Sequence, residues 1–396
     1  MNSIHSDRIA SITTLTKLLE SNDWNGKLVV SPDVDGVVSA NLISHIFDAE
    51  LIGFYDPGST SVLRLCEGYD WSDAESALWL DHDITDSRII SVGQHMIYPY
   101  ARSTTDLAGF EDRPDLFEYD RRSNFQRNQQ SFNPHDIGRF GWDHPRTFPR
   151  CNQQDCEGIA LSNDISCRRH GGSWTLGDWD RIRGFRRKYP FATIHLLLAA
   201  LQHHEFNITP RAELLIAHSD SAWLAATQNA NNAVWWLRNV LDSEPNARSI
   251  AGTLPQHTTS RETMLEHLRL IWSLDDATII DLANEPRVQR ESGVRDLSIY
   301  AAGYTMGNKQ HLHPRWENGN LDDLSIAISS MTGWNFRAAS GSLNITAEGD
   351  SEKLDPRRNP SWEGEDFARW LEENRVFSLA FTGMDTLRFT TNMTIL

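Results

Sequence analysis

One stretch of the sequence decides the fold: Lys27-Leu28-Val29-Val30-Ser31-Pro32-Asp33-Val34-Asp35-Gly36-Val37-Val38-Ser39-Ala40. Leu28 to Ser31 form a short apolar run typical of a β-strand, and Ser39 to Phe47 show the spacing of a helix. Between them lies an acidic turn in which Asp33 and Asp35 are two residues apart and Gly36 follows. A strand, an acidic turn and a helix therefore open the predicted fold.

The acidic turn has the composition of a binding loop. Two carboxylates so spaced can converge on one hard cation such as Mg²⁺ or Mn²⁺, and the glycine lets the backbone approach closely. Ser39 is placed to begin the helix as a cap or to contact an anion at its positive end, which makes it a predicted substrate-binding residue. The alternative is an ordinary acidic turn between a strand and a helix.

Three further strand-like runs follow: Leu51 to Tyr55, Ala77 to Leu80 and Ile89 to Val92. Four such runs, separated by segments of helix or loop length, predict a parallel sheet with crossover helices. Asp81 follows the third run and His95 the fourth. Ligands bind outside the carboxyl ends of the strands in such sheets, so we expect these side chains to meet the acidic turn at one edge.

Composition describes a soluble globular chain. It has 396 residues, with 37 Lys plus Arg against 54 Asp plus Glu and a formal charge of −17, and 39 % of its residues are hydrophobic. This length allows two domains, and this composition excludes a disordered chain, a disulfide-stapled miniature and a collagen-like or coiled-coil rod. The negative charge argues against broad binding of duplex nucleic acid, so any nucleotide or short single strand would have to bind locally.

The pattern along the chain predicts two domains. Residues 1–250 are expected to form an α/β domain with an irregular insertion at about 98–187 and a helical middle section that begins at Phe191. Residues 251–396 are expected to form a smaller α+β domain, because strand-like and helical runs mix there.

The sequence predicts a cytoplasmic protein without a membrane segment. Its longest apolar run, Ile194 to Leu201, is far below the roughly 20 residues of a membrane span. The N-terminal stretch has helical spacing and lacks the pattern of a signal peptide. Four cysteines fit a reducing compartment.

The acidic motifs resemble those of the DHH phosphoesterase superfamily. The leading motif of that family, Asp-x-Asp-Gly-x-x-Ser-Ala after a strand, is matched from Asp33 to Ala40, and its later single Asp is similar to Asp81. The name-giving Asp-His-His aligns with Gly93-Gln94-His95, in which the final His is kept. A fourth family carboxylate would be Asp220.

The resemblance implies a metal-dependent hydrolase of nucleotide or short oligonucleotide phosphoesters. Mn²⁺, or Mg²⁺, would be the cofactor. The residues carried over are three catalytic and metal-binding carboxylates, a catalytic histidine and a further metal-binding carboxylate: Asp33, Asp35, Asp81, His95 and Asp220.

The sequence departs from the family in places that leave two other interpretations open. Ser31 stands where many members carry a His, and Gly93 and Gln94 replace an Asp and a His that in the family bind metal and polarise the phosphate. His82, Asp83 or His218 could compensate, or the chain could be a catalytically degenerate nucleotide-binding or assembly module. A third interpretation is a haloacid-dehalogenase-like phosphatase, in which Asp33 and Asp35 would serve as nucleophile and acid.

The insertion contains two further candidate sites. A possible structural Zn²⁺ site groups three cysteines and a histidine within 20 residues: Cys151, Cys156, Cys167 and His170. The one distinctly basic segment follows, and its Arg186 and Arg187 are predicted to bind a nucleotide or a short single strand. Free thiols and a solvated basic face are the alternatives. The paired histidines His203 and His204 are interpreted as surface residues, and an assembly with copies of itself or with other proteins stays open.

Overall fold

The computed structural model describes residues 12–57, 60–95, 131–134, 189–209, 321–355, 365–383 and 386–396, with positions 212, 215, 216, 219, 305, 306, 312 and 313. The helices in this part of the chain are α1 (Ile12–Leu19), α2 (Val34–Phe47), α3 (Trp71–Glu75), α8 (Thr193–Leu201), α16 (Leu321–Thr332) and α17 (Glu365–Glu373). The first strands are β1 (Lys27–Val30), β2 (Glu50–Asp56), β3 (Val62–Cys66), β4 (Leu78–Leu80) and β5 (Ile90–Val92). The later strands are β6 (Thr305–Met306), β7 (Leu312–His313), β8 (Arg337–Ala338), β9 (Leu343–Leu354), β10 (Val376–Gly383) and β11 (Thr386–Ile395).

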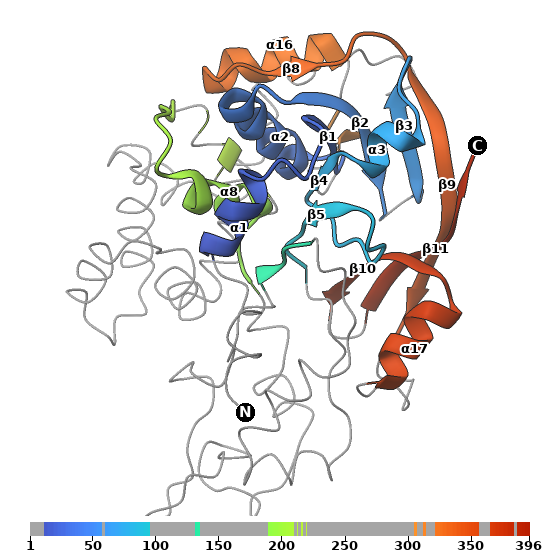
Figure 1. Cartoon of the computed structure of the whole chain (residues 1–396). Helices are drawn as coiled ribbons and strands as arrows, with labels where there is room; N and C mark the ends of the chain where they lie inside the picture. Colours follow the sequence, from blue (N-terminus) through green and yellow to red (C-terminus); the bar gives the residue numbers. More distant parts are fainter. Residues whose placement is uncertain are drawn as a thin grey trace, which may run out of the picture.

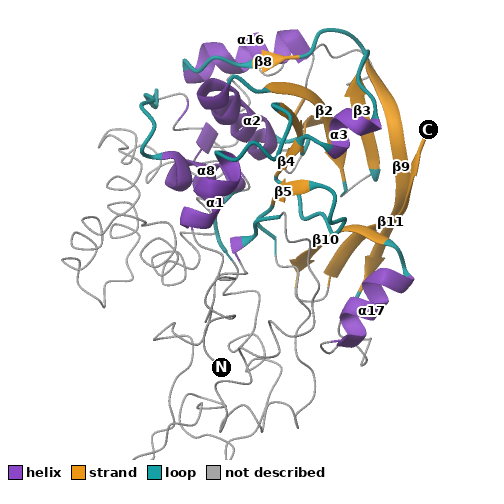
Figure 2. Ribbon diagram, in the orientation of Figure 1, coloured by secondary structure: helices purple, strands orange, loops and turns teal. Residues whose placement is uncertain are grey.

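The α/β class is confirmed, but the sheet is mixed instead of wholly parallel. Within the described residues its strand order is β10-β11-β9-β3-β2-β1-β4-β5, and β8 pairs with β2 (Figure 2). Strands β1, β2, β4, β5 and β8 pair in parallel. Strands β3, β9, β10 and β11 join antiparallel. Strands β1, β2, β4 and β5 are buried on both faces over most of their length, which agrees with their apolar runs.

The sheet is continued by strands from the C-terminal segment. β9 pairs antiparallel with β3, so residues from both sides of the predicted boundary at 250 belong to one sheet. That boundary itself lies outside the described residues, and the two-domain division stays a prediction.

The sheet also curls, because its last strand contacts the loop that follows β4. Ile84 forms a bridge with Ser378 of β10, the Leu379 amide donates to the Asp83 carbonyl at 3.2 Å, and the Thr85 amide donates to Phe377 at 2.9 Å. The C-terminal hairpin β10–β11 therefore holds the segment that carries Asp81 and Asp83.

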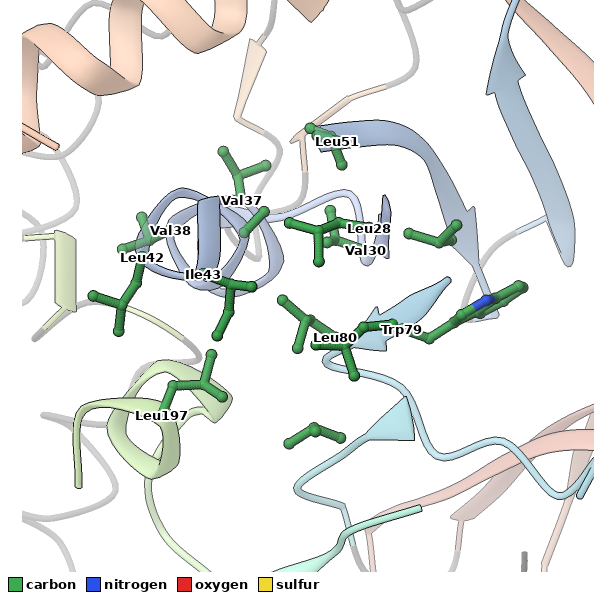
Figure 3. Close-up of a cluster of buried hydrophobic side chains, with 14 of the residues drawn as sticks. Leu28, Val30, Val37, Val38, Leu42, Ile43, Leu51, Trp79, Leu80 and Leu197 are labelled. Atoms are coloured by element: carbon green, nitrogen blue, oxygen red, sulfur yellow. The ribbon is translucent and has the colours of Figure 1, made fainter. Parts of the chain in front are cut away.

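Helix α2 lies against the parallel strands with α1 and α8 beside it (Figure 1). In Figure 3 its Ile43 points toward Leu80 of β4 and Leu197 of α8, and its Val37 lies on another side of the helix. These side chains are all at most 1 % exposed. Burial at this level contributes about 1.5 to 3 kcal/mol for each large aliphatic side chain, which fixes α2 and α8 on the sheet. No helix among the described residues is long and apolar enough to cross a membrane.

A candidate metal centre at the carboxyl edge of the sheet

The three aspartates of the predicted site lie together at the carboxyl ends of β1 and β4. Asp33 is the N-cap of α2 and accepts a hydrogen bond from the Gly36 amide at 2.9 Å. Asp35 lies in the first turn of the same helix. Asp81 directly follows β4, with a positive φ of 61° that turns the chain away from the strand direction. All three are buried.

Ser31 joins two of these carboxylates. Its Oγ lies 2.8 Å from Asp33 Oδ1 and 2.6 Å from Asp81 Oδ2. One hydroxyl proton can serve only one acceptor at a time. Ser31 stands where the resemblance would place a His, and here the position supplies a hydrogen-bond donor.

The N-terminus of α8 holds the third carboxylate. The amides of Thr193 and Ile194 donate to Asp35 Oδ2 and Oδ1 at 2.7 and 2.9 Å, and Thr193 Oγ1 donates to Asp81 Oδ1 at 3.0 Å. The positive end of the helix dipole favours a carboxylate at this place. Asp35 therefore fixes α8 as well as contributing charge to the site.

Gln94 reaches between two of the carboxylates. Its Nε2 lies 3.5 Å from Asp35 Oδ2 and 3.4 Å from Asp81 Oδ1, which are long for N–H···O hydrogen bonds. An amide that turns over presents its oxygen in place of its nitrogen, so Gln94 can also offer a metal ligand. Asp33, Asp35, Asp81 and Gln94 are the residues that could hold a cation here.

Asp83 fills the space beside Gly93. A methyl group at position 93 would overlap Asp83 Oδ1 and would lie 2.6 Å from the His82 carbonyl oxygen. The Asp83 carboxylate, from the loop after β4, thus occupies the space that a side chain at position 93 would need. Asn133 Nδ2 donates to Asp83 Oδ1 at 2.6 Å and fixes it.

His95 pairs with Asp83. The His95 amide donates to Asp83 Oδ2 at 3.1 Å, and His95 Nδ1 lies 3.2 Å from the same oxygen. The side chain of His95 is 28 % exposed. A carboxylate on Nδ1 orients the imidazole ring.

His82, between Asp81 and Asp83, packs in a cluster of aromatic rings. Its ring packs edge-on against Tyr55 and Trp79 at centroid distances of 5.3 and 5.7 Å. Neither ring nitrogen has a hydrogen-bond partner among the described residues. Burial lowers the pKa of His82 to about 3, so its ring is neutral at neutral pH.

The remaining predicted residues divide into two groups. Ser39 Oγ lies 3.4 Å from Asp35 Oδ1, so it faces the site. The others lie outside the described residues: Asp220, Arg186, Arg187, Cys151, Cys156, Cys167 and His170.

Sequence reasoning missed Thr193 and Asn133. Each lies far from the acidic motifs in the sequence and close to them in space. A helix that starts at Thr193 was a usable signal, because the amides of a helix start can bind a carboxylate. Asn133 gave no signal, since it lies in the irregular insertion.

Comparisons of the chain with models of known protein families, with curated proteins and with solved structures found no match.

Proposed function

We propose that this chain is a DHH-like, divalent-metal-dependent phosphoesterase that hydrolyses a nucleotide or short oligonucleotide. The single observation behind the proposal is the convergence of Asp33, Asp35 and Asp81. They come from two different strand ends and are linked by shared donors, Ser31 and Thr193. Carboxylate oxygens at a buried strand edge suit Mn²⁺ or Mg²⁺.

The pair of Asp83 and His95 supports the same proposal. Asp83 stands in for the family carboxylate missing at Gly93, and it orients His95, the one residue kept from the family's name-giving motif. A cation in such a site lowers the pKa of bound water and stabilises charge on phosphoryl oxygens. The part-exposed His95 would then exchange a proton with the attacking water or the leaving oxygen.

A second candidate function is a catalytically degenerate module that binds a nucleotide or takes part in an assembly. One observation favours it: both positions that lost a family histidine, Ser31 and Gln94, now direct hydrogen-bond donors at the carboxylates. Donors of this kind, with the amides of Thr193 and Ile194, stabilise ionised carboxylates without a cation. The two functions differ in metal binding and turnover, so one experiment separates them.

The best variant for that experiment is Asp81→Asn. An amide at position 81 can donate to the Ser31 hydroxyl, which can itself accept, so the local contacts survive while the charge is lost. Asp35→Asn is a poorer choice, because its amide NH₂ would face one of the two backbone amides that Asp35 now binds. Asp23→Asn, at an exposed position, is the matched control.

Mn²⁺ binding would be measured by calorimetry on the full chain, and hydrolysis of a dinucleotide and of a nucleoside diphosphate would be assayed with Mn²⁺ present. The phosphoesterase predicts that the wild type and Asp23→Asn bind Mn²⁺ and turn over, and that Asp81→Asn loses both. If the wild type neither bound Mn²⁺ nor hydrolysed either substrate, the phosphoesterase proposal would be overturned. In that case the degenerate module would predict that the wild type still binds the nucleotide without Mn²⁺.

A further inference from the structure

Three potential metal ligands meet on the surface at the far end of α8. Glu20 Oε1 lies 2.7 Å from His203 Nε2 and 3.3 Å from His204 Nε2. These ligand atoms all lie within 4.8 Å of one another. The side chains are 40, 48 and 32 % exposed for Glu20, His203 and His204, so an ion in solution can reach them.

We propose that Glu20, His203 and His204 form a binding site for Zn²⁺ that clamps α1 to α8. This site is separate from the carboxylate centre and does not rest on the proposed function. Two imidazoles and one carboxylate are a ligand set that Zn²⁺ takes with a fourth position left to water. The hard ions expected at the aspartates prefer oxygen ligands alone.

The distances fit a shared ion. Ligands of a tetrahedral Zn²⁺ with bonds of about 2.0 Å lie about 3.3 Å from one another. The two Glu20 distances, 2.7 and 3.3 Å, are close to this value before any ion is bound. The imidazole rings are 4.3 Å apart between centroids and tilted by 47°, and the ligand atoms of the three side chains lie within 4.8 Å of one another.

The backbone prepares the site. Glu20 follows α1 directly, and His203 lies two residues beyond the end of α8. The last turns of these helices lie side by side, since Thr16 Oγ1 is 2.8 Å from the Ala200 carbonyl oxygen. Both helices therefore end at the site with the negative ends of their dipoles, which favours a cation there.

An aromatic contact orients one of the ligands. The ring of Phe47, at the end of α2, packs edge-on against His204 with centroids 5.6 Å apart. The hydrogen bond between His203 and Glu20 joins two atoms that the ion would take, so its proton is released when the ion binds. Orienting contacts of this kind raise metal affinity, because the ligands lose less freedom on binding.

The test is a calorimetric titration of Zn²⁺ into the chelator-treated full chain and into Glu20→Gln and His204→Gln. We expect each substitution to remove one equivalent of bound Zn²⁺ or to weaken its affinity. The loss of affinity should exceed the roughly 10- to 100-fold that follows when a residue that only orients a ligand is replaced. Adding Zn²⁺ should raise the thermal unfolding midpoint of the wild type. The increase should be smaller in both variants.

Controls separate this site from the other candidates. Glu205→Gln removes an exposed carboxylate next to His204 and should titrate like the wild type. Asp81→Asn should also keep the equivalent, so failure of the carboxylate centre would leave this result standing. Co²⁺ serves as a second probe, because its absorption differs between sites with and without thiolate ligands. Glu20→Gln should lose part of the visible absorption of bound Co²⁺. It should keep any near-ultraviolet bands, since these come from Co²⁺ bound to thiolates elsewhere in the chain. Identical titrations of the wild type and Glu20→Gln, or equal losses in Glu20→Gln and Glu205→Gln, would overturn the proposal.

Discussion

At the scale of single residues, Gly93 is fixed by the side chain that packs beside it. The position has no room for a side chain, because the Asp83 carboxylate and the His82 carbonyl oxygen occupy the space. Asp83 is itself held by Asn133 and by the His95 amide. The glycine is therefore a requirement of the Asp83–His95 pair.

Gly93→Ala tests this requirement. The added methyl must displace Asp83, and overpacking of this kind costs about 1 to 3 kcal/mol of stability. Urea denaturation would measure the loss. In the double variant Gly93→Ala/Asp83→Ala, the carboxylate that crowds the new methyl group is absent. The stability losses of the two single variants should therefore sum to more than the loss measured for the double variant. Simple additivity, or an unchanged stability in Gly93→Ala, would contradict this account.

At the scale of elements, Tyr55 ties the parallel strands to the C-terminal hairpin. Its hydroxyl lies 2.9 Å from Ser378 Oγ of β10 and donates to Thr390 Oγ1 of β11 at 2.8 Å. Burial raises the pKa of Tyr55 well above its ordinary value, so the hydroxyl stays protonated. Its ring packs against Trp79 and Phe377. The hairpin in turn holds the loop from Asp81 to Thr85, so this contact supports the candidate site indirectly.

Tyr55→Phe should therefore loosen the hairpin. The ring packing is kept, but buried hydroxyls of Ser378 and Thr390 lose a partner, which costs about 1 to 3 kcal/mol. Tyr69→Phe is the matched control, because the Tyr69 hydroxyl binds Glu50 at a partly buried position where water can replace it. Hydrogen exchange should speed up at β10 and β11 in Tyr55→Phe, and in Tyr69→Phe it should not. Equal exchange in both variants would show that Tyr55 does not hold the hairpin.

At the scale of the whole molecule, two buried histidines make stability depend on pH. Burial lowers the pKa of His82 and of His195 to about 3 in each case. The unfolded chain binds a proton at each near pH 6.5, so between these values the unfolded state holds more protons. The stabilising effect of keeping both neutral is complete above about pH 6.5 and is lost as the pH falls toward 3.

His82→Phe isolates one of these contributions. Phenylalanine keeps the ring between Tyr55 and Trp79 and removes two nitrogens that lack partners among the described residues. The free energy of unfolding should fall less steeply with acid, by up to roughly 1.4 kcal/mol per pH unit between pH 6 and 4. Stability at neutral pH should be equal or greater. Denaturation curves at several pH values measure both effects, and an unchanged slope would rule out a neutral buried His82.

The sequence by itself determined the parallel part of the sheet and the aspartates at its edge. The predicted runs coincide with β1, β2, β4 and β5 within a residue or two, because each is an apolar stretch bounded by turns. The helical section predicted to begin at Phe191 contains α8, because apolar residues recur there at helical spacing. Asp33, Asp35 and Asp81 followed from the rule that strand ends share an edge.

Only the tertiary structure decided the rest. β9 is largely polar and exposed, and its strand form comes from pairing with β3 and β11, which no local pattern reveals. Thr193 and Glu20 acquire their partners across more than 100 residues of chain. Such contacts depend on how α8 packs on the sheet, because packing selects among the many surfaces that one local sequence allows. The carboxylates could be predicted from local sequence, whereas their hydrogen-bond donors are determined by tertiary packing.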